Sequence, residues 1–311
     1  SDFKMPQYFD DGSYLFNDNI GSVMVNETFF STITNHNYTI NVYLPAGYNE
    51  SQTRYASFYA GDGVFYAYAW NGRNILDYLD FYNKTDPLIG VFITPFDYSI
   101  HRNIEYTTNR QKYADFIVDE LIPYIDSKYR TINDSKSRAH IGSSYGGFFS
   151  LYIAAQYPQF FKLVGSQSVS VLSYDPIISG TNYATMEEYF RHSPKIEEMR
   201  FYLNGGTYES GILNEAHKIS KTLAEKGYSG KFRAFHQAHD PGQWRATLGE
   251  MLTFLFTNES SDYSGSPINY GDIQNPTKSE QDSSENSTPY AILPIILISM
   301  ALLVFIRNNK R

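Results

Sequence analysis

Short apolar runs alternate with segments of helical periodicity along the first 256 residues. Residues 38–44 alternate apolar and polar positions, as in a half-buried strand, and residues 88–94 form the continuous apolar run of a strand buried on both faces. Strands are expected at 38–44, 54–60, 88–94, 137–142, 162–166, 200–204 and 231–236, and helices at 109–129, 146–157, 212–226 and 243–256. This alternation predicts an α/β fold with an open, mostly parallel sheet and helices on both faces.

A different pattern occupies the end of the chain. Residues 291–306 are uncharged and almost wholly apolar, and Arg307, Lys310 and Arg311 follow at once. As a helix this run would be about 24 Å long, slightly less than the ~30 Å hydrocarbon core of a bilayer. It predicts a single transmembrane helix over 290–306 and, by the positive-inside bias, a cytoplasmic tail over 307–311. A buried C-terminal helix and a lipid-anchor signal are the alternatives.

The segment between these parts, 257–289, is rich in Ser, Asn, Asp, Gly, Gln and Pro and lacks hydrophobic periodicity, which predicts a flexible linker. We therefore expect an extracellular globular head over 1–256, a stalk and a membrane anchor. The chain begins at Ser1, and we infer that a leader peptide was removed or not included. N-x-Ser/Thr sequons agree with an extracellular head, at Asn26, Asn37, Asn49, Asn83, Asn133, Asn258 and Asn286.

Composition narrows the classes of function. The formal net charge is −8 and only 19% of residues are charged, so the chain lacks the basic stripe that a phosphate backbone requires, which excludes nucleic-acid binding. The absence of cysteine excludes disulfide scaffolds, thiolate zinc sites and cysteine nucleophiles. With 42% hydrophobic and 17% aromatic residues, most of the chain can bury a core.

The strongest chemical motif spans residues 142–146, Gly-Ser-Ser-Tyr-Gly, which matches G-x-S-x-G. An apolar strand precedes it and a helix follows, as a nucleophile elbow requires. Ser144 would then lie on a turn tight enough to lift its Oγ above the sheet edge, where side chains at 142 and 146 are expected to collide. The following helix would direct its first amides towards an oxyanion. A glycine-rich turn without chemistry is the alternative.

A serine nucleophile needs a general base, normally histidine, and a carboxylate that orients it. After a nucleophile elbow the acid comes first in the chain and the histidine second. His239 follows the strand expected at 231–236 and is the favoured base, with His236 as its competitor. Glu209 follows the strand expected at 200–204 and is the favoured acid, ahead of Glu215 on the next helix. A plain alternative makes Glu209 a first-turn acid stabilised by the helix dipole.

Residues 236, 239 and 240 (His, His and Asp) also have a spacing that a metal ion could use. Ligands three residues apart on an extended loop are poorly placed for coordination, and no third cluster helps them. No metal site is therefore expected.

Several strings in residues 38–256 resemble the putative-esterase branch of the α/β-hydrolases, which includes esterase D and enterochelin esterase-like proteins. They are residues 42–48 (VYLPAGY), 54–63 (RYASFYAGDG), 120–126 (ELIPYID), 141–147 (IGSSYGG), 157–161 (YPQFF), 166–168 (SQS) and 206–209 (GTYE). The chain departs from the family at Ala238, where Gly or another small residue is usual, and at Pro241, where Trp is usual. Its acid is Glu where Asp is commoner.

The resemblance implies an α/β-hydrolase fold with Ser144 as nucleophile, Glu209 as acid and His239 as base. It further implies an oxyanion hole that pairs the amide of Tyr145 with that of Val64 or Gly63. Residues near the substrate pocket would be Arg102, Glu105 and Trp244.

These observations predict a membrane-anchored extracellular serine esterase that hydrolyses carboxylic esters through an acyl-enzyme, without metal or organic cofactor. The expected substrate is a small-molecule or glycan ester, and the membrane is the expected partner of the C-terminal helix. The alternatives are an acyltransferase of the same fold with a sugar or alcohol acceptor, and a surface binding protein with an idle fold. Neither the substrate nor the oligomeric state follows from the sequence.

Overall fold

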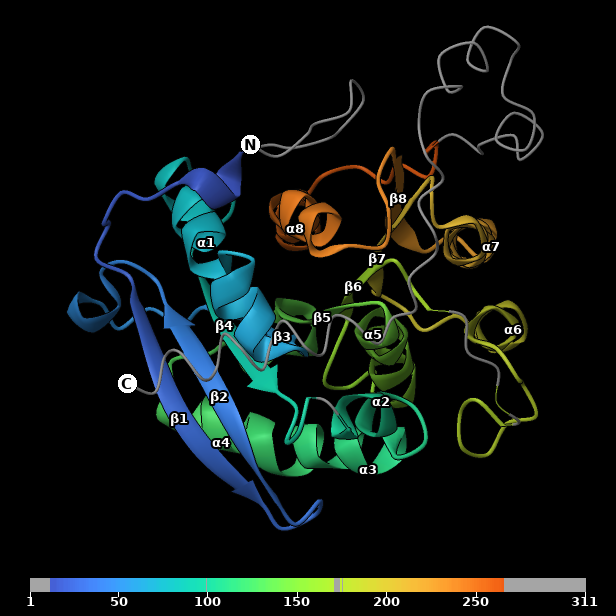
Figure 1. Ribbon diagram of the computed structural model, residues 1–311, viewed down its shortest axis with the longest axis horizontal. Coiled ribbons are helices and arrows are strands. Elements are labelled where there is room, and N and C mark those ends of the chain that lie inside the picture. The colour runs from blue at the N-terminus through green and yellow to red at the C-terminus, as the bar shows by residue number, and fades with distance from the viewer. Residues whose placement is uncertain (1–11, 99, 171–173, 175, 266–311) are drawn as a thin grey trace, which may run out of the picture. The chain divides into compact units, whose positions relative to one another are not determined.

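The computed structural model describes residues 12–265 apart from 99, 171–173 and 175. In this part of the chain eight strands form one sheet in the order β1-β2-β4-β3-β5-β6-β7-β8 (Figure 1). The pairs β1–β2 and β2–β4 are antiparallel, and the remaining pairs are parallel, which confirms the mostly parallel sheet. The strands are β1 Val23–Ser31, β2 His36–Leu44, β3 Ala56–Ala60, β4 Leu88–Thr94, β5 Arg138–Ser143, β6 Leu163–Gln167, β7 Arg200–Gly206 and β8 Ser229–Phe235.

Helices cover both faces of the sheet, as expected. In Figure 1, α1 and α8 lie together on one face and α2 to α5 on the other, while α7 packs against β7 and β8. The α-helices are α1 Gly72–Phe81, α2 His101–Tyr106, α3 Arg110–Asp115, α4 Ile122–Lys128, α5 Tyr145–Gln156, α6 Met186–His192, α7 Ser210–Glu225 and α8 Pro241–Phe256. Short 3-10 turns occur at η1 Ser13–Leu15, η2 Tyr48–Glu50 and η5 Ser135–Ser137, and π-helical turns at η3 Phe65–Ala69 and η4 Phe116–Leu121.

The single helix expected over 109–129 is interrupted. The structure divides it into α3, the π-helical turn η4 and α4. Pro123 lies in the first turn of α4 and has no N–H to donate to the carbonyl four residues before it. The wider hydrogen-bonding pattern of η4 precedes this position, and a π-helical turn of this kind lets a helix continue past a missing bond.

Strand β1 was not expected from the pattern. Its apolar residues stand next to each other instead of alternating, and Val23 and Phe30 are exposed. As an edge strand it pairs with β2 alone among the described strands, with a register that runs from Val23 opposite Leu44 to Ser31 opposite His36. Backbone pairing, rather than an amphipathic pattern, therefore defines this strand. The helices α1, α2 and α6 were also not expected.

The globular part continues beyond residue 256, where the linker was expected to begin. The Arg200 Nη2 atom donates to the Glu259 carbonyl at 2.6 Å. The Asp262 amide donates to the Gly230 carbonyl at 2.9 Å, and the Phe232 amide donates to the Asp262 carbonyl at 3.0 Å. The segment after α8 therefore hydrogen-bonds to β8, and the packed structure reaches at least residue 265.

The rest of the expected linker, the apolar run at 290–306 and the tail at 307–311 lie outside the described residues. Among the helices that the structure describes, none combines the length and the apolar character needed to cross a bilayer. The transmembrane helix over 290–306 therefore stays a prediction.

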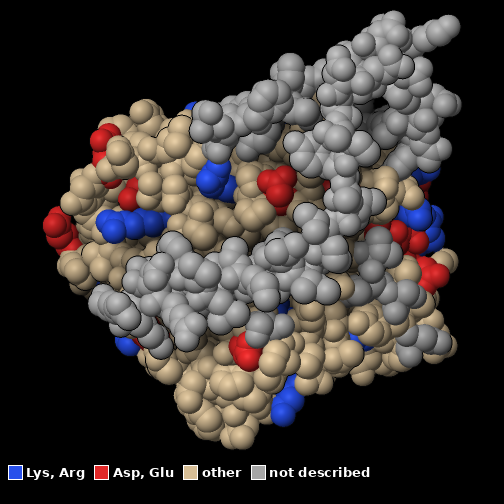
Figure 2. All heavy atoms as spheres, in the orientation of Figure 1, with Lys and Arg blue, Asp and Glu red and all other residues tan. Residues whose placement is uncertain are grey.

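Charged residues are sparse on one face of the molecule. On the face in Figure 2, uncharged residues cover most of the described area, and lysine and arginine side chains are scattered among them. Six of the sequon asparagines are described and all six are exposed, namely Asn26, Asn37, Asn49, Asn83, Asn133 and Asn258. Asn286 lies outside the described residues.

Candidate active site

Ser144 occupies the tight turn between β5 and α5. Its backbone has φ 58° and ψ −122°, a strained conformation for a residue with a side chain. A Cβ atom at Gly142 would lie 2.4 Å from the Gly146 carbonyl oxygen, so this glycine is required. The collision expected at Gly146 is wrong, because a Cβ there would meet nothing closer than 3.4 Å. Gly147 is the crowded position instead, since its Cβ would lie 2.9 Å from Ser166 Oγ.

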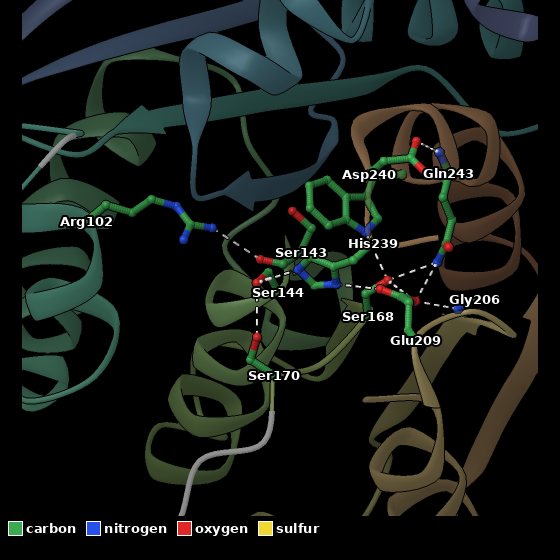
Figure 3. Close-up of polar contacts among 11 residues, drawn as sticks. Arg102, Ser143, Ser144, Ser168, Ser170, Gly206, Glu209, His239, Asp240 and Gln243 are labelled. Atoms are coloured by element: carbon green, nitrogen blue, oxygen red, sulfur yellow. Dashed lines mark hydrogen bonds and ion pairs between the residues drawn. The ribbon is translucent and has the colours of Figure 1, made fainter. Parts of the chain in front are cut away.

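Three side chains from separate loops meet at this turn (Figure 3). His239, in the loop between β8 and α8, places its Nε2 atom 3.0 Å from Ser144 Oγ. Its Nδ1 atom contacts the Glu209 carboxylate, and Glu209 is the N-cap residue of α7. The loops follow β5, β7 and β8, so the side chains converge at the C-terminal ends of parallel strands, where ligands of such sheets bind.

The alternative bases and acids do not reach this site. His236 is exposed, and its Nδ1 atom lies 3.0 Å from Thr207 Oγ1. Glu215 lies on α7, 3.7 Å from Lys218 Nζ. Within the described residues, no group of three or more His, Asp or Glu side chains is placed to hold a metal ion.

Donors surround the Glu209 carboxylate, whose side chain has no exposed area. Ser168 Oγ donates to Glu209 Oε2 at 2.9 Å, and the Gly206 amide donates to the same oxygen. Gln243 Nε2, from α8, lies 3.5 Å from this oxygen. Because a buried carboxyl group is costly unless it is hydrogen-bonded, these donors compensate for the burial of Glu209 beside His239.

Ser168 connects the acid to the base. Its Oγ accepts hydrogen bonds from Gln243 Nε2 and from the indole Nε1 of Trp244, each at 2.9 Å. The Trp244 ring stands edge-on to the His239 ring, with centroids 4.9 Å apart and an interplanar angle of 89°. Trp244 is buried, so it supports His239 rather than lining an open pocket as the resemblance implied.

An ion pair braces the turn that follows β3. Arg102 Nε and Nη2 donate to the two oxygens of Asp62 at 2.6 Å each, and Nη2 lies 3.4 Å from the Ser143 carbonyl. Burial opposes the charge of Arg102, but Asp62 outweighs this effect and holds the pKa of the guanidinium above its ordinary value. Arg102 therefore ties the turn after β3 to the nucleophile turn.

The turn itself is tightly constrained. Asp62 has φ 55°, and a Cβ atom at Gly63 would lie 2.6 Å from the Phe92 backbone. Val64 follows at the start of η3, and Tyr145 is the first residue of α5. Among the described residues, neither the Val64 amide nor the Tyr145 amide has a hydrogen-bond acceptor. Both amides are therefore available to an oxyanion.

Glu105 lies away from the reaction centre. Its side chain is buried and accepts a hydrogen bond from Tyr38 OH at 2.8 Å, and no contact joins it to Ser144, His239 or Glu209 among the described residues. Burial raises the pKa of Glu105 to about 7. The expected role of Glu105 in a substrate pocket is therefore replaced by a position in the protein interior.

The roles of several residues at the site could not be predicted from the sequence. Ser170 Oγ lies 3.0 Å from Ser144 Oγ, and Asp240 caps α8 by accepting from the Gly242 amide at 2.7 Å. Asp62 and Ser168 lie within strings that resembled the family, but nothing in those strings assigned them a role. Partners separated by tens of residues could not be inferred from spacing.

A family model described as "Putative esterase" matches residues 31–255 of the chain. The uncharacterized protein YjcH of Bacillus subtilis is 27% identical over 237 residues, which cover 72% of this chain and 93% of that protein. The endo-1,4-beta-xylanase/feruloyl esterase of Xylanibacter ruminicola is 26% identical over 243 residues. That match covers 74% of this chain and 31% of the relative, so the chain spans about a third of the length of that protein.

Solved structures with the same fold include two kinds of esterase. A ferulic acid esterase is 20% identical with a TM-score of 0.62, over 76% of this chain and 97% of that chain. The enterobactin esterase FES from Shigella flexneri is 21% identical with a TM-score of 0.68, over 81% and 64% of the respective chains. The ferulic acid esterase AmCE1/Fae1A from Anaeromyces mucronatus is 17% identical with a TM-score of 0.63, over 82% and 98%.

Proposed function

The chain belongs to the putative-esterase family and is an ester hydrolase, and from this premise we propose that it cleaves carboxylic esters by nucleophilic attack of Ser144. One observation carries the proposal. A continuous series of contacts runs from Ser144 Oγ through both ring nitrogens of His239 to the buried carboxylate of Glu209. Nucleophile, base and orienting acid are the three groups that acyl transfer to serine requires.

In the proposed reaction, Ser144 Oγ attacks the ester carbonyl carbon while His239 Nε2 takes the serine proton. Glu209 accepts a hydrogen bond from His239 Nδ1, which fixes the tautomer with a free Nε2 and stabilises the imidazolium that forms. His239 then gives the proton to the leaving alcohol as the carbon–oxygen bond breaks. A water molecule, deprotonated by His239, then attacks the acyl carbonyl carbon. The bond from this carbon to Ser144 Oγ breaks as His239 returns the proton to that oxygen, which releases the carboxylic acid and restores Ser144.

The negative charge that develops on the carbonyl oxygen needs donors in place before the reaction. We assign this role to the amides of Tyr145 and Val64, which have no acceptor among the described residues. Loss of one such donor typically costs ~2.7–4 kcal/mol of transition-state stabilisation. The ion pair between Arg102 and Asp62 keeps the turn after β3 and the nucleophile turn in fixed positions relative to each other, and so supports both donors.

We further propose that the enzyme acts at the cell surface, anchored by a transmembrane helix over 290–306 and glycosylated at its sequons. The apolar run with basic residues after it, and the exposure of the six described sequon asparagines, support this proposal. The carboxylic ester of a small molecule or a glycan is the proposed substrate class.

Hydrolysis of 4-nitrophenyl acetate and 4-nitrophenyl butyrate by the full chain tests the proposed reaction. We expect turnover that is lost in Ser144→Ala and retained in Ser127→Ala, which changes an exposed serine on α4. A fluorophosphonate should label the wild-type protein at Ser144 and fail to label the variant. Equal hydrolysis by wild type and Ser144→Ala would refute the proposal. A rate that requires an added alcohol would favour an acyltransferase.

A further inference from the structure

A second hydroxyl group contacts the nucleophile. Ser170 lies in the segment that follows β6, and its Oγ atom is 3.0 Å from Ser144 Oγ. The backbone supports this position, because the Ser170 amide donates to the Ser144 carbonyl at 3.2 Å. Among the described residues, Ser144 is the only hydrogen-bond partner of the Ser170 hydroxyl. The side chain of Ser170 is therefore directed at the oxygen that reacts.

The direction of the hydrogen bond between the two hydroxyl groups follows from the triad. Glu209 accepts the proton of His239 Nδ1, so Nε2 of the neutral imidazole is an acceptor. The single proton of the Ser144 hydroxyl is therefore used towards Nε2, which lies 3.0 Å from Ser144 Oγ. A hydroxyl oxygen also has two lone pairs that accept. Ser144 Oγ consequently accepts from Ser170, whose hydroxyl is the donor.

This contact assigns every bonding position of the nucleophilic oxygen. Figure 3 shows His239 and Ser170 approaching Ser144 from different sides, so the proton faces His239 and one lone pair faces Ser170. The remaining lone pair is the one that attacks the ester. After acylation the oxygen is bonded to Cβ and to the acyl carbon, and its two lone pairs face His239 and Ser170. Both residues can therefore act on this oxygen at the same time.

The strength of the hydrogen bond from Ser170 changes along the reaction. The ester oxygen of the acyl-enzyme is a weak acceptor, but it gains negative charge as its bond to the acyl carbon breaks. A hydrogen bond to a charged acceptor is roughly twice as strong as one between neutral groups. Only an interaction that strengthens in the transition state raises a rate. In acylation the Ser144 hydroxyl already accepts this bond, so the gain there is smaller.

We propose that Ser170 is a further catalytic residue, whose hydroxyl stabilises Ser144 Oγ as the leaving oxygen of deacylation. The inference rests on the proposed function of Ser144. Water has by then attacked the acyl carbon and given a proton to His239. As the bond from that carbon to Ser144 Oγ breaks, the oxygen keeps the electron pair and receives the proton from His239 Nε2. Ser170 donates a hydrogen bond to the same oxygen and keeps its own proton.

Two quantities, measured with the full chain and 4-nitrophenyl acetate, separate acylation from deacylation. The value of kcat/KM reports acylation, because release of 4-nitrophenolate completes that step. Mass spectrometry of acid-quenched protein during steady turnover, at one ester concentration, gives the ratio of acylated to free protein. This ratio rises when deacylation slows. We expect Ser170→Ala to raise the ratio about tenfold and to change kcat/KM by less than about twofold.

Ser166→Ala is the matched control, because Ser166 lies on β6 and its buried hydroxyl has no hydrogen-bond partner among the described residues. We expect it to leave both quantities unchanged. Ser170→Thr and Ser170→Val introduce side chains of the same shape, of which only the first has a hydroxyl. Ser170→Thr should keep the wild-type ratio, and Ser170→Val should behave like Ser170→Ala. Thermal melting shows whether each variant folds, and the second pair keeps the test valid if Ser170→Ala does not.

Two results overturn the inference alone. One is a ratio of acylated to free protein that Ser170→Ala and Ser170→Val leave unchanged. The other is a tenfold fall in kcat/KM, which would mean that Ser170 only orients Ser144 for attack. Equal hydrolysis by wild type and Ser144→Ala, or an acyl group mapped to another residue, would refute the proposed function and this inference with it.

Discussion

Replacing Ser168 with alanine tests whether the hydrogen bonds behind the triad hold it in place. Ser168 is fully buried; its hydroxyl donates to Glu209 and accepts from Gln243 and Trp244. Ser168→Ala removes all three bonds while keeping the Cβ atom. The backbone at this position has φ 49°, so the unfavourable conformation is common to serine and alanine and cancels in the comparison.

The largest cost falls on the indole of Trp244, whose Nε1 loses its acceptor inside the protein. A buried donor without a partner costs roughly 1–3 kcal/mol. Gln243 Nε2 still has Glu209 Oε2 at 3.5 Å, so its loss is smaller. The carboxylate loses one donor, which adds about 1 kcal/mol. We therefore expect Ser168→Ala to lower the free energy of unfolding by about 2–4 kcal/mol and kcat by about tenfold, because Glu209 is less firmly oriented.

Urea unfolding followed by circular dichroism gives the stability, and ester hydrolysis gives kcat. Ser168→Gly is the matched control, because it removes the same bonds but relieves the left-handed backbone, and it should be about 1 kcal/mol more stable than the alanine variant. Trp244→Phe removes the donor, so the double variant with Ser168→Ala should be destabilised by less than the sum of the two single changes. Strict additivity together with an unchanged kcat for Ser168→Ala would refute the reasoning.

Three further predictions concern buried charge. Burial lowers the pKa of His140 from 6.5 to about 3, so folded His140 stays neutral while the unfolded chain takes up a proton below pH 6.5. The free energy of unfolding should therefore fall by about 3 kcal/mol between pH 6.5 and 4. In urea titrations at several pH values, His140→Gln should show much less of this dependence on pH. Burial raises the pKa of Glu105 from 4.5 to about 7, so its stabilising contribution is complete below pH 4.5 and is lost as the pH rises through 7. At pH 8 the free energy of unfolding of Glu105→Gln should therefore exceed that of the wild type by up to about 3 kcal/mol, less the cost of a weaker hydrogen bond to Tyr38. An equal increase at pH 4 would contradict this cause. Arg102→Met should leave Asp62 unpaired, destabilise the fold by about 3–5 kcal/mol and reduce kcat more than it changes KM; a change in KM alone would refute a role in positioning the oxyanion turn.

The sequence predicted the parts of the fold that burial dictates. Strand β4 is apolar throughout because both of its faces are covered, and its predicted limits agree with the structure. Ser144, Glu209 and His239 could be placed together because each follows a parallel strand, and such strands end at the same edge. Strand β1 could not be predicted, because backbone pairing with β2 defines it and its side chains carry no clear pattern.

The residues behind the triad were harder to predict for a related reason. Trp244 and Ser168 lie 76 positions apart in the chain, and only the folded sheet brings the indole nitrogen to the hydroxyl. Glu105 resembled a pocket residue, but Tyr38 on β2 holds it in the interior. Local patterns report which face of an element is buried, whereas hydrogen-bond partners depend on how the elements pack.

The short segment after α8 also determines how the protein behaves towards other copies of itself. Strand β8 is the last strand of the sheet, and the backbone groups of Gly230 and Phe232 are paired with Asp262. Without that segment they would form an open edge that can add a strand from another molecule. A protein shortened to residue 256 would keep its triad but is expected to associate through β8 and to aggregate, whereas one that ends after residue 265 retains its own edge cover.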